Sequence, residues 1–454
     1  MTQTHNLTRG PIAGTLARFA IPVLITLFLQ ALYGAVDLLI VGQFAHTAHI
    51  SGVATGSILL QTVTLVVTEL GIGVTILAGE KIGQKDPRQA GQVIGNGILL
   101  FGVIALLMTA FLVVGAPRLA TLLHAPEGAF EETVSYIRIC GAGSIFIVAY
   151  NLLGSIFRGV GDSRTPLLTV AIASCINIAG DLLLVAGFHM GASGAAIATV
   201  FAQGASVGIS FILMRKKELP FQFSKEFLHV QWKMIFSLLR IGLPVALQEL
   251  LVGLSFLVIQ TVVNTFGVVV SAGVGVAEKV CGFIMLVPSA YMQSMSAFVA
   301  QNMGAQNPFR AKKALGYGIA TSLVAGVFMF YLSFFHGDLL SGIFSKDVQV
   351  IAASQDYLRA YAIDCLLTPF LFCFMGFFNG MEKTVFVMLQ GIFGAFCVRI
   401  PIVYWVSRLS NVTLFEIALA TPASTVVQIL LCLGMFLFWN RSFKNCDPPN
   451  EQKI

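Results

Sequence analysis

The chain has 454 residues, of which 57% are hydrophobic and only 11% are charged, with a formal net charge of +6. Soluble domains carry about 25% charged residues, so a water-soluble fold could not hide this much apolar surface. Many apolar runs exceed the roughly 20 residues that cross a bilayer as a helix, and they lack the alternation of a transmembrane β-barrel. The sequence therefore predicts an all-α polytopic membrane protein.

The chain starts with a short polar segment, MTQTHNLTRGPIAGTLAR, and the first apolar run follows at once. No cleavable signal peptide is expected. The eight cysteines are scattered singly without a CxxC pair. They are interpreted as small apolar packing residues rather than as disulfides or metal ligands.

Apolar runs between polar breaks predict twelve membrane spans. They are expected at 17–44, 51–78, 93–115, 133–157, 166–188, 192–214, 237–265, 270–299, 314–336, 354–379, 385–407 and 414–440. No Walker A sequence, phosphorylation motif, Ser–His–Asp set or catalytic Cys–His pair stands out. Neither enzymatic activity nor ATP-driven pumping by this chain alone is expected, and no cofactor is implied.

The basic residues indicate an orientation. If both termini and the even-to-odd loops share one side, that side holds 20 Lys and Arg against 5 on the other, and Lys279 and Arg399 fall within spans. Positive charges gather in cytoplasmic loops. Both termini are therefore predicted to be cytoplasmic.

An internal repeat is the strongest organisational signal. The matching segments are Arg18 and Pro22 with Arg240 and Pro244, then 79–90 with 300–311, 136–138 with 357–359, and 157–159 with 378–380. The offset between the members of each pair is 221 or 222 residues. An even number of spans makes both halves start on the same side, so they are predicted to be parallel repeats.

The predicted organisation follows from this repeat. A six-helix lobe at 1–214 is expected to be joined by a linker at 215–236 to a second six-helix lobe at 237–440, with a cytoplasmic tail at 441–454. The linker is basic with interleaved aromatics and is interpreted as lying at the membrane interface. A nucleic-acid patch is the alternative interpretation, but no nucleic-acid partner is expected. Two such lobes predict alternating access with a substrate site between them.

Charges inside spans are costly and mark ion or substrate paths by default. Asp37 lies in the otherwise apolar first span, about eight residues or roughly 12 Å from its outer end. Tyr33 and Gln30 precede it by four and seven residues, so all three share one helical face. This polar face is expected to point to the protein interior rather than to lipid.

The fifth and sixth spans carry matching polar residues. Asn177 and Asp181 are four residues apart on one face, and Thr199 follows 18 residues after Asp181. If these faces meet Asp37, they form an all-oxygen set suited to a hard monovalent cation or to a shared proton, because two buried carboxylates do not both ionise easily. The alternative is a structural polar network that ties the helices together.

The C-terminal half holds five more charges within spans. Glu278 and Lys279 are adjacent and therefore point to different faces of one helix. Glu249 and Asp364 either bind a cationic substrate or neutralise Lys279 and Arg399, and the sequence does not distinguish these possibilities.

Three further residues have weaker signals. Glu69 is expected near the cytoplasmic end of the second span, in either a solvated or a buried position. His46 and His49 have a spacing suited to a metal, but they are expected in the first external loop without partner ligands. A plain polar loop is the preferred interpretation.

Several segments, taken together and in this order, resemble the multidrug and toxic compound extrusion (MATE) family. They are LARFAIP at 16–22, VDLLIVG at 36–42, GQKDP at 83–87, AQNP at 305–308 and FRGVGDSRTP at 157–166. The basic loop after the second span that marks major-facilitator proteins is absent from the sequence. The resemblance extends over essentially all twelve spans.

The resemblance implies a V-shaped pair of six-helix lobes and antiport, in which substrate leaves while H⁺ or Na⁺ enters. The family's N-lobe cation site carries over to Asp37, Asn177, Asp181 and Thr199. Its neighbouring polar residues, which surround the cation or contact substrate, correspond to Gln30, Tyr33, Tyr136 and Asn151.

The C-terminal lobe departs from the norfloxacin-extruding branch of this family. The position of that branch's glutamate in the seventh span is Val252 here, and the nearest acid is Glu249. Its aspartate in the tenth span falls on Thr368, with Asp364 one turn earlier. The cation site is therefore expected in the N-terminal lobe.

The expected function is a monomeric exporter of amphipathic, cationic compounds, driven by H⁺ or Na⁺, in the inner membrane of a bacterium. One alternative is a lipid-linked oligosaccharide flippase, whose cavity would need several basic residues, whereas only Lys279 and Arg399 lie deep in the spans. A non-transporting receptor or channel is the second alternative, and the duplicated halves argue against it.

Overall fold

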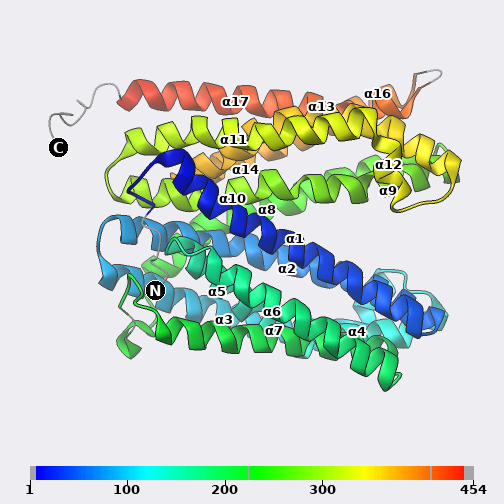
Figure 1. Cartoon of the computed structure of the whole chain (residues 1–454), viewed down its shortest axis with the longest axis horizontal. Helices are drawn as coiled ribbons and strands as arrows, with labels where there is room; N and C mark the ends of the chain where they lie inside the picture. The colour runs from blue at the N-terminus through cyan, green and yellow to red at the C-terminus, as the bar shows by residue number, and fades with distance from the viewer. Residues whose placement is uncertain (1–6, 223, 410–411, 444–454) are drawn as a thin grey trace. The chain divides into compact units, whose positions relative to one another are not determined.

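The computed structural model describes residues 7–222, 224–409 and 412–443, and within these residues all regular elements are helices (Figure 1). By length and composition, 11 helices can cross a membrane, and one bent helix pair raises the number to 12. The predicted fold class is therefore confirmed. From residue 444 onward, the predicted tail lies outside the described residues.

The first half of the chain holds six of the spans. They are α1 (Ile12–Phe44), α2 (Thr47–Gly83), α3 (Pro87–Leu122), the pair α4 (Phe130–Ala142) and α5 (Ser144–Gly159), α6 (Arg164–Asp181) with η2 (Leu182–Gly187), and α7 (Gly191–Lys216). The 54° bend between α4 and α5 falls within the predicted span 133–157. A short 3₁₀ turn, η1 (Glu127–Ala129), precedes α4.

The second half repeats this order. Its elements are η3 (Lys225–Phe227), α8 (Trp232–Asn264), α9 (Val268–Ile284), α10 (Leu286–Gly304), α11 (Pro308–Phe335), α12 (Gly337–Gly342), α13 (Val348–Gly380), α14 (Thr384–Ile392), η4 (Phe393–Arg399), α15 (Ile400–Val406), α16 (Leu414–Ala418) and α17 (Ala420–Phe443). Each span predicted for this half has a counterpart among these helices, with ends that differ by a few residues.

The chain divides into two compact units. The first comprises 1–249 with the shorter segments 289–318 and 376–385, and the second comprises 250–288, 319–375 and 386–454. Each unit has its own core of buried aliphatic side chains. The first unit thus combines the first half of the sequence with parts of α8, α10, α11, α13 and α14 from the second.

The KDP turn at 85–87 and the QNP turn at 306–308 have the same local structure in the two halves of the chain. Lys85 and Gln306 both have positive φ, at 58° and 55°. In the next position Asp86 accepts a hydrogen bond from Gln89 N at 2.9 Å and begins α3. Asn307 likewise accepts from Arg310 N at 3.0 Å and begins α11. A polar cap followed by proline at the first helical position is a strong helix start, so both halves break and restart at this point.

Glycines at matched positions bring helices into backbone contact in both halves. A Cβ on Gly159 would lie 2.9 Å from Thr75 O, between α5 and α2. A Cβ on Gly380 would lie 2.7 Å from Ser296 O, between α13 and α10. These positions are related by the offset of the sequence repeat, so the repeat extends to the packing of the helices.

A second pair of matched glycines joins α2 to α10 within the first unit. A Cβ on Gly83 would stand 2.0 Å from Gln301 O, and one on Gly304 would stand 2.1 Å from Glu80 O. Real Cβ atoms do not approach this closely, so only glycine permits the observed contact. We call this contact, formed by Gly83, Gln301, Gly304 and Glu80, the α2–α10 seam.

The linker between the halves packs on α3. Phe227 is buried, and a Cβ on Gly95 would meet its carbonyl oxygen at 2.5 Å. The backbone N–H of Gln231 donates to Asn96 Oδ1 at 2.8 Å, and α8 begins at the next residue. At least this part of the linker is therefore anchored to protein.

Candidate functional site

The four residues predicted to bind a cation converge within the first unit. Thr199 Oγ1 on α7 lies 3.3 Å from Asp37 Oδ2 on α1 and 3.0 Å from Ala195 O, and its hydroxyl can donate to either. Asn177 Nδ2 on α6 donates to Thr199 Oγ1 at 3.4 Å. The Asp181 carboxyl, one turn further along α6, lies within hydrogen-bonding range of Asp37.

This site is buried and rich in oxygen atoms that have no partner. Asp181 is 0% exposed and Asp37 is 6% exposed. Asp37 Oδ1, Asn177 Oδ1 and both carboxylate oxygens of Asp181 have no hydrogen-bond donor. Buried polar groups are nearly always bonded, and two ionised carboxylates cannot bond to each other. A proton between the two aspartates or a cation among these oxygens would satisfy them.

Local backbone structure positions the aspartate on α6. The π-helix η2 begins at Leu182, directly after Asp181. Such wide turns interrupt the regular helix and recur at functional sites. A Cβ on Gly180 would meet Ala198 Cβ at 2.9 Å, so this glycine lets α6 and α7 approach beside Thr199.

Tyr33 and Tyr136 surround the aspartates, as the sequence predicts. Tyr136 on α4 is buried and lies within electrostatic range of Asp37 and Asp181. A Cβ on Gly56 of α2 would stand 2.5 Å from its ring, so the glycine makes room for the tyrosine. Tyr33 is within electrostatic range of Asp37 and lines a small cavity together with Gln203 on α7.

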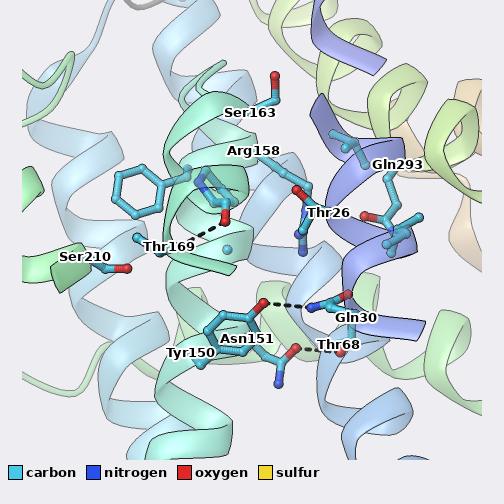
Figure 2. A pocket seen from close by; sticks show the side chains of 15 residues that line it. Thr26, Gln30, Thr68, Tyr150, Asn151, Arg158, Ser163, Thr169, Ser210 and Gln293 are labelled. Carbon is cyan, nitrogen blue, oxygen red and sulfur yellow. Dashed lines mark hydrogen bonds between the residues drawn. The ribbon is translucent and has the colours of Figure 1, made fainter. Parts of the chain in front are cut away.

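A cavity with about 590 Å³ of empty space, open in part to solvent, lies within the first unit (Figure 2). Gln30 Nε2 donates to Tyr150 Oη at 2.7 Å, and Thr68 Oγ1 donates to Asn151 Oδ1 at 2.8 Å. Asn151 therefore lines this cavity rather than contacting the two aspartates directly. Tyr150 also lines a smaller cavity with Tyr33, Asn177 and Thr199, so its ring borders both spaces.

Sequence reasoning did not select Tyr150, Thr68 or Arg158. Arg158 was assigned to a loop, but it lies in the last turn of α5 and lines the cavity of Figure 2. A signal was available, because Asn151 and Arg158 are seven residues apart and share one helical face. The same face of α5 thus supplies the amide and the guanidinium.

The charges of the second unit form a separate cluster. Arg399 Nη1 donates to Ser255 Oγ at 3.0 Å, and the guanidinium lies 4.4 Å from the centre of the Phe256 ring. Asp364 is buried and within electrostatic range of Arg399. In the described structure no ion pair within 4.0 Å joins Asp364 to Arg399, so both possibilities left open by the sequence stay predictions.

Three expectations about isolated charges need correction or refinement. Lys279 lies within the span Val268–Gly304, as predicted, but its side chain is exposed, whereas its neighbour Glu278 is half-buried, because adjacent residues point to different helix faces. Glu249 belongs to the first unit and lies within electrostatic range of Glu69, whereas Lys279 belongs to the second unit. Glu69 is buried, at 5% exposure, which decides between the two positions that the sequence allowed.

The two histidines have a structural role. His49 belongs to the first turn of α2 rather than to a loop, and its Nδ1 lies 2.9 Å from Glu132 Oε2. No group of three or more His, Cys, Asp or Glu residues in the described parts of the chain could hold a metal ion. Na⁺ differs from such metal ions because carbonyl and hydroxyl oxygens can also bind it.

In the described residues, eleven apolar helices and one bent helix pair in duplicated halves define a polytopic membrane protein of the transporter class. The sequence model of the MatE family matches residues 22–183 and again residues 244–405. The chain belongs to this family. The starts of the two matches differ by the offset of the predicted repeat, which confirms the duplication.

Comparisons with known proteins agree with this assignment. The probable multidrug resistance protein YoeA of Bacillus subtilis is 23% identical over 449 residues, or 96% of each chain. The FAD transporter of Shewanella oneidensis is 26% identical over 365 residues, covering 79% of this chain and 80% of its own. A multidrug resistance MATE family transporter solved in an outward-facing conformation matches with a TM-score of 0.91 at 19% identity, covering 98% of this chain and 99% of that one.

Proposed function

We propose that the protein is a secondary active multidrug efflux antiporter that exports amphipathic, cationic compounds in exchange for H⁺ or Na⁺. The observation that carries this proposal is the buried oxygen set formed by Asp37, Asn177, Asp181 and Thr199. A buried pair of carboxylates with no donor at three of its four oxygens is costly in a structural role, because an uncompensated charge inside a protein is strongly destabilising. Loading and release of a cation explains why both aspartates are there.

In the proposed cycle, a cation enters the site from the outside and neutralises the pair. The loaded site favours the inward-open state and weakens binding of substrate, and release of the cation to the cytoplasm resets the site. Exchange requires only that cation and substrate bind the two states with different affinity. The polar cavity lined by Gln30, Tyr150 and Asn151 is the proposed place for substrate contact.

Transport by the purified full-length protein in proteoliposomes tests this proposal. Ethidium serves as the cationic probe, and Na⁺ and H⁺ gradients are imposed separately. We expect one gradient to drive ethidium transport in the wild type and Asp37→Asn to reduce it to the level of empty liposomes. Asp338→Asn makes the same chemical change at an exposed position and should transport normally. Wild-type transport by Asp37→Asn would refute the proposed coupling site.

The alternative as a lipid-linked oligosaccharide flippase predicts a different cavity. A pyrophosphate lipid calls for several basic groups, and the cavity of Figure 2 has one, Arg158, among the described residues. The relative named as an FAD transporter makes an anionic substrate worth a direct test. FAD and ethidium are therefore compared as substrates in the same liposomes, and FAD export without ethidium export would assign an anionic substrate class.

We propose that both termini face the cytoplasm of a bacterial inner membrane. Basic residues on the loops of that side, 20 against 5, support this orientation. Alkaline phosphatase fused to the C-terminus should be inactive, and the same enzyme inserted after Lys346, in the loop that precedes α13, should be active. The reverse result would invert the proposed topology.

A further inference from the structure

The segment that enters α1, residues 7–10, packs on helices of the second half of the chain. The side chain of Leu7 is fully buried. Asn302 Nδ2 on α10 donates to Leu7 O at 3.2 Å and to Phe298 O at 2.7 Å. We call residues 7–10 the N-terminal strap. The strap and the parts of α10 and α11 that it contacts all belong to the first unit.

Arg310, near the start of α11, binds the strap with every nitrogen of its guanidinium. Nη1 donates to Gly10 O at 2.7 Å and Nη2 donates to Arg9 O at 2.9 Å. Nε and Nη2 each lie 3.4 Å from Leu7 O. Hydrogen bonds from a charged donor are stronger than neutral ones, and the planar fork of arginine also fixes their directions. One side chain thus binds three carbonyl groups within four residues.

A glycine turn leads from the strap into α1. Gly10 has a φ of 80°, a conformation that residues with a side chain rarely adopt. Only Pro11 separates this turn from α1, which begins at Ile12. Thr15 Oγ1 donates to Pro11 O at 2.8 Å and closes the first turn of the helix. The strap is therefore joined to α1 without slack, and it cannot follow a movement of α10 unless the start of α1 moves as well.

The strap lies beside the α2–α10 seam. Asn302, which donates to Leu7, is next to Gln301 and two residues from Gly304, and both of these belong to the seam. In the seam, α2 comes from the first half of the chain and α10 from the second. Separation of α10 from α2 would therefore also pull α10 away from α1 and break the hydrogen bonds of the strap. The strap is a second tie across the boundary that the seam closes.

The second half of the chain has a comparable tie. Pro87 begins α3 and Pro308 begins α11, at the offset of the sequence repeat. The linker that enters α8 packs on α3, where Gln222 N donates to Pro87 O at 3.0 Å. Each half thus has its entry segment tied to the third helix of the other half. The position that matches Arg310 is Gln89, so only the tie at α11 uses a guanidinium.

We propose that the N-terminal strap is a latch that holds the start of α1 to α10 and α11, and that it leaves Arg310 whenever the α2–α10 seam opens. Arg310 acts in this latch as a positioning residue. Release breaks hydrogen bonds only, so no chemical step and no further reactant are involved. The latch depends on neither the coupling ion nor the substrate, and it goes beyond the antiport proposed above.

Trypsin cleavage after Arg9 tests whether Arg310 holds the strap. A protease needs an extended, detached segment, so the rate at which full-length protein in nanodiscs loses an N-terminal epitope tag follows the population of released strap. Arg310→Gln should raise this rate about tenfold or more, because several charge-assisted hydrogen bonds are lost. Arg88→Gln, a matched change at an exposed arginine of α3, should leave it unchanged. Equal rates in Arg310→Gln and wild type would overturn the proposal, and Leu7→Ser repeats the test if Arg310→Gln does not fold.

Cysteine labelling tests whether the strap also holds the seam. Ala300 on α10 is fully buried against Gly79 of α2, so Ala300→Cys in a background without native cysteines reports separation of the two helices. Addition of Arg310→Gln should raise the labelling rate by a membrane-impermeant maleimide about tenfold. A rate unchanged by Arg310→Gln would overturn the role as a latch. Both measurements omit substrate and ion gradients, so a failure of the proposed antiport would not alter their outcome.

Discussion

Replacement of Gly304 by alanine should open the α2–α10 seam. The new Cβ would lie 2.1 Å from Glu80 O and 2.8 Å from Glu80 C, and ordinary contact begins at 3.4 Å. The obstacle is backbone rather than a movable side chain, so the helices must separate by about 1.3 Å or distort. Overpacking of this kind costs about 1–3 kcal/mol. The conformation that contains the seam should therefore lose population by about 5- to 150-fold relative to one in which the helices are apart.

Cysteine accessibility measures this shift. Ala300 on α10 is fully buried and in contact with Gly79 of α2, so a cysteine at Ala300 in a background without native cysteines reports opening of the seam. Its rate of labelling by a membrane-impermeant maleimide should rise by the same factor in Gly304→Ala. Gly316→Ala introduces a Cβ with nothing within 4 Å and should leave the rate unchanged. Equal rates in the two variants would refute the reasoning.

Three further changes have defined outcomes. Burial raises the pKa of the Asp162 carboxyl, but hydrogen bonds from Lys217 and Thr165 outweigh it and hold the pKa below its ordinary value. Wild type should therefore melt at a higher temperature than Asp162→Asn at neutral pH, and scanning fluorimetry should find this advantage disappearing below about pH 4, as the pH falls through the folded-state pKa. Thr199→Val removes one neutral ligand and should weaken the apparent affinity for the coupling cation by about tenfold, measured as the cation concentration for half-maximal exchange; an unchanged value would remove Thr199 from the site. Gly56→Ala should displace the Tyr136 ring at a cost of about 1–3 kcal/mol and reduce exchange, which ethidium transport would detect, whereas normal exchange would mean that the ring position is unimportant.

The sequence was sufficient to predict the spans and the convergence of the aspartate site. Span length follows from bilayer thickness, and the 3.6-residue period fixes which residues share a face. The helical period therefore predicts interior faces for Asp37, Asn177 and Asp181. Avoidance of lipid turns each polar stripe inward, and the resemblance to the MATE family predicts that these residues meet Thr199.

The surroundings of Arg158 and Glu69 could not be predicted in the same way. Whether a charge within a span is buried depends on how closely neighbouring helices approach, and at Glu69 glycines 71 and 242 set that approach. Lys279 lies within a span, as its position predicts, and the rotation of α9 leaves its side chain exposed. Helix rotation and separation arise from side-chain packing between distant segments, which a single sequence does not display.

The anchoring of the linker has a mechanical consequence. The backbone N–H of Gln231 is hydrogen-bonded to Asn96 of α3, and α8 begins at the following residue. No free residues therefore separate this anchor from the first turn of α8. The start of α8 can therefore turn about this anchor but cannot slide away from α3 unless the hydrogen bond breaks. The linker therefore enters α8 as an attachment to α3 rather than as a loose tether.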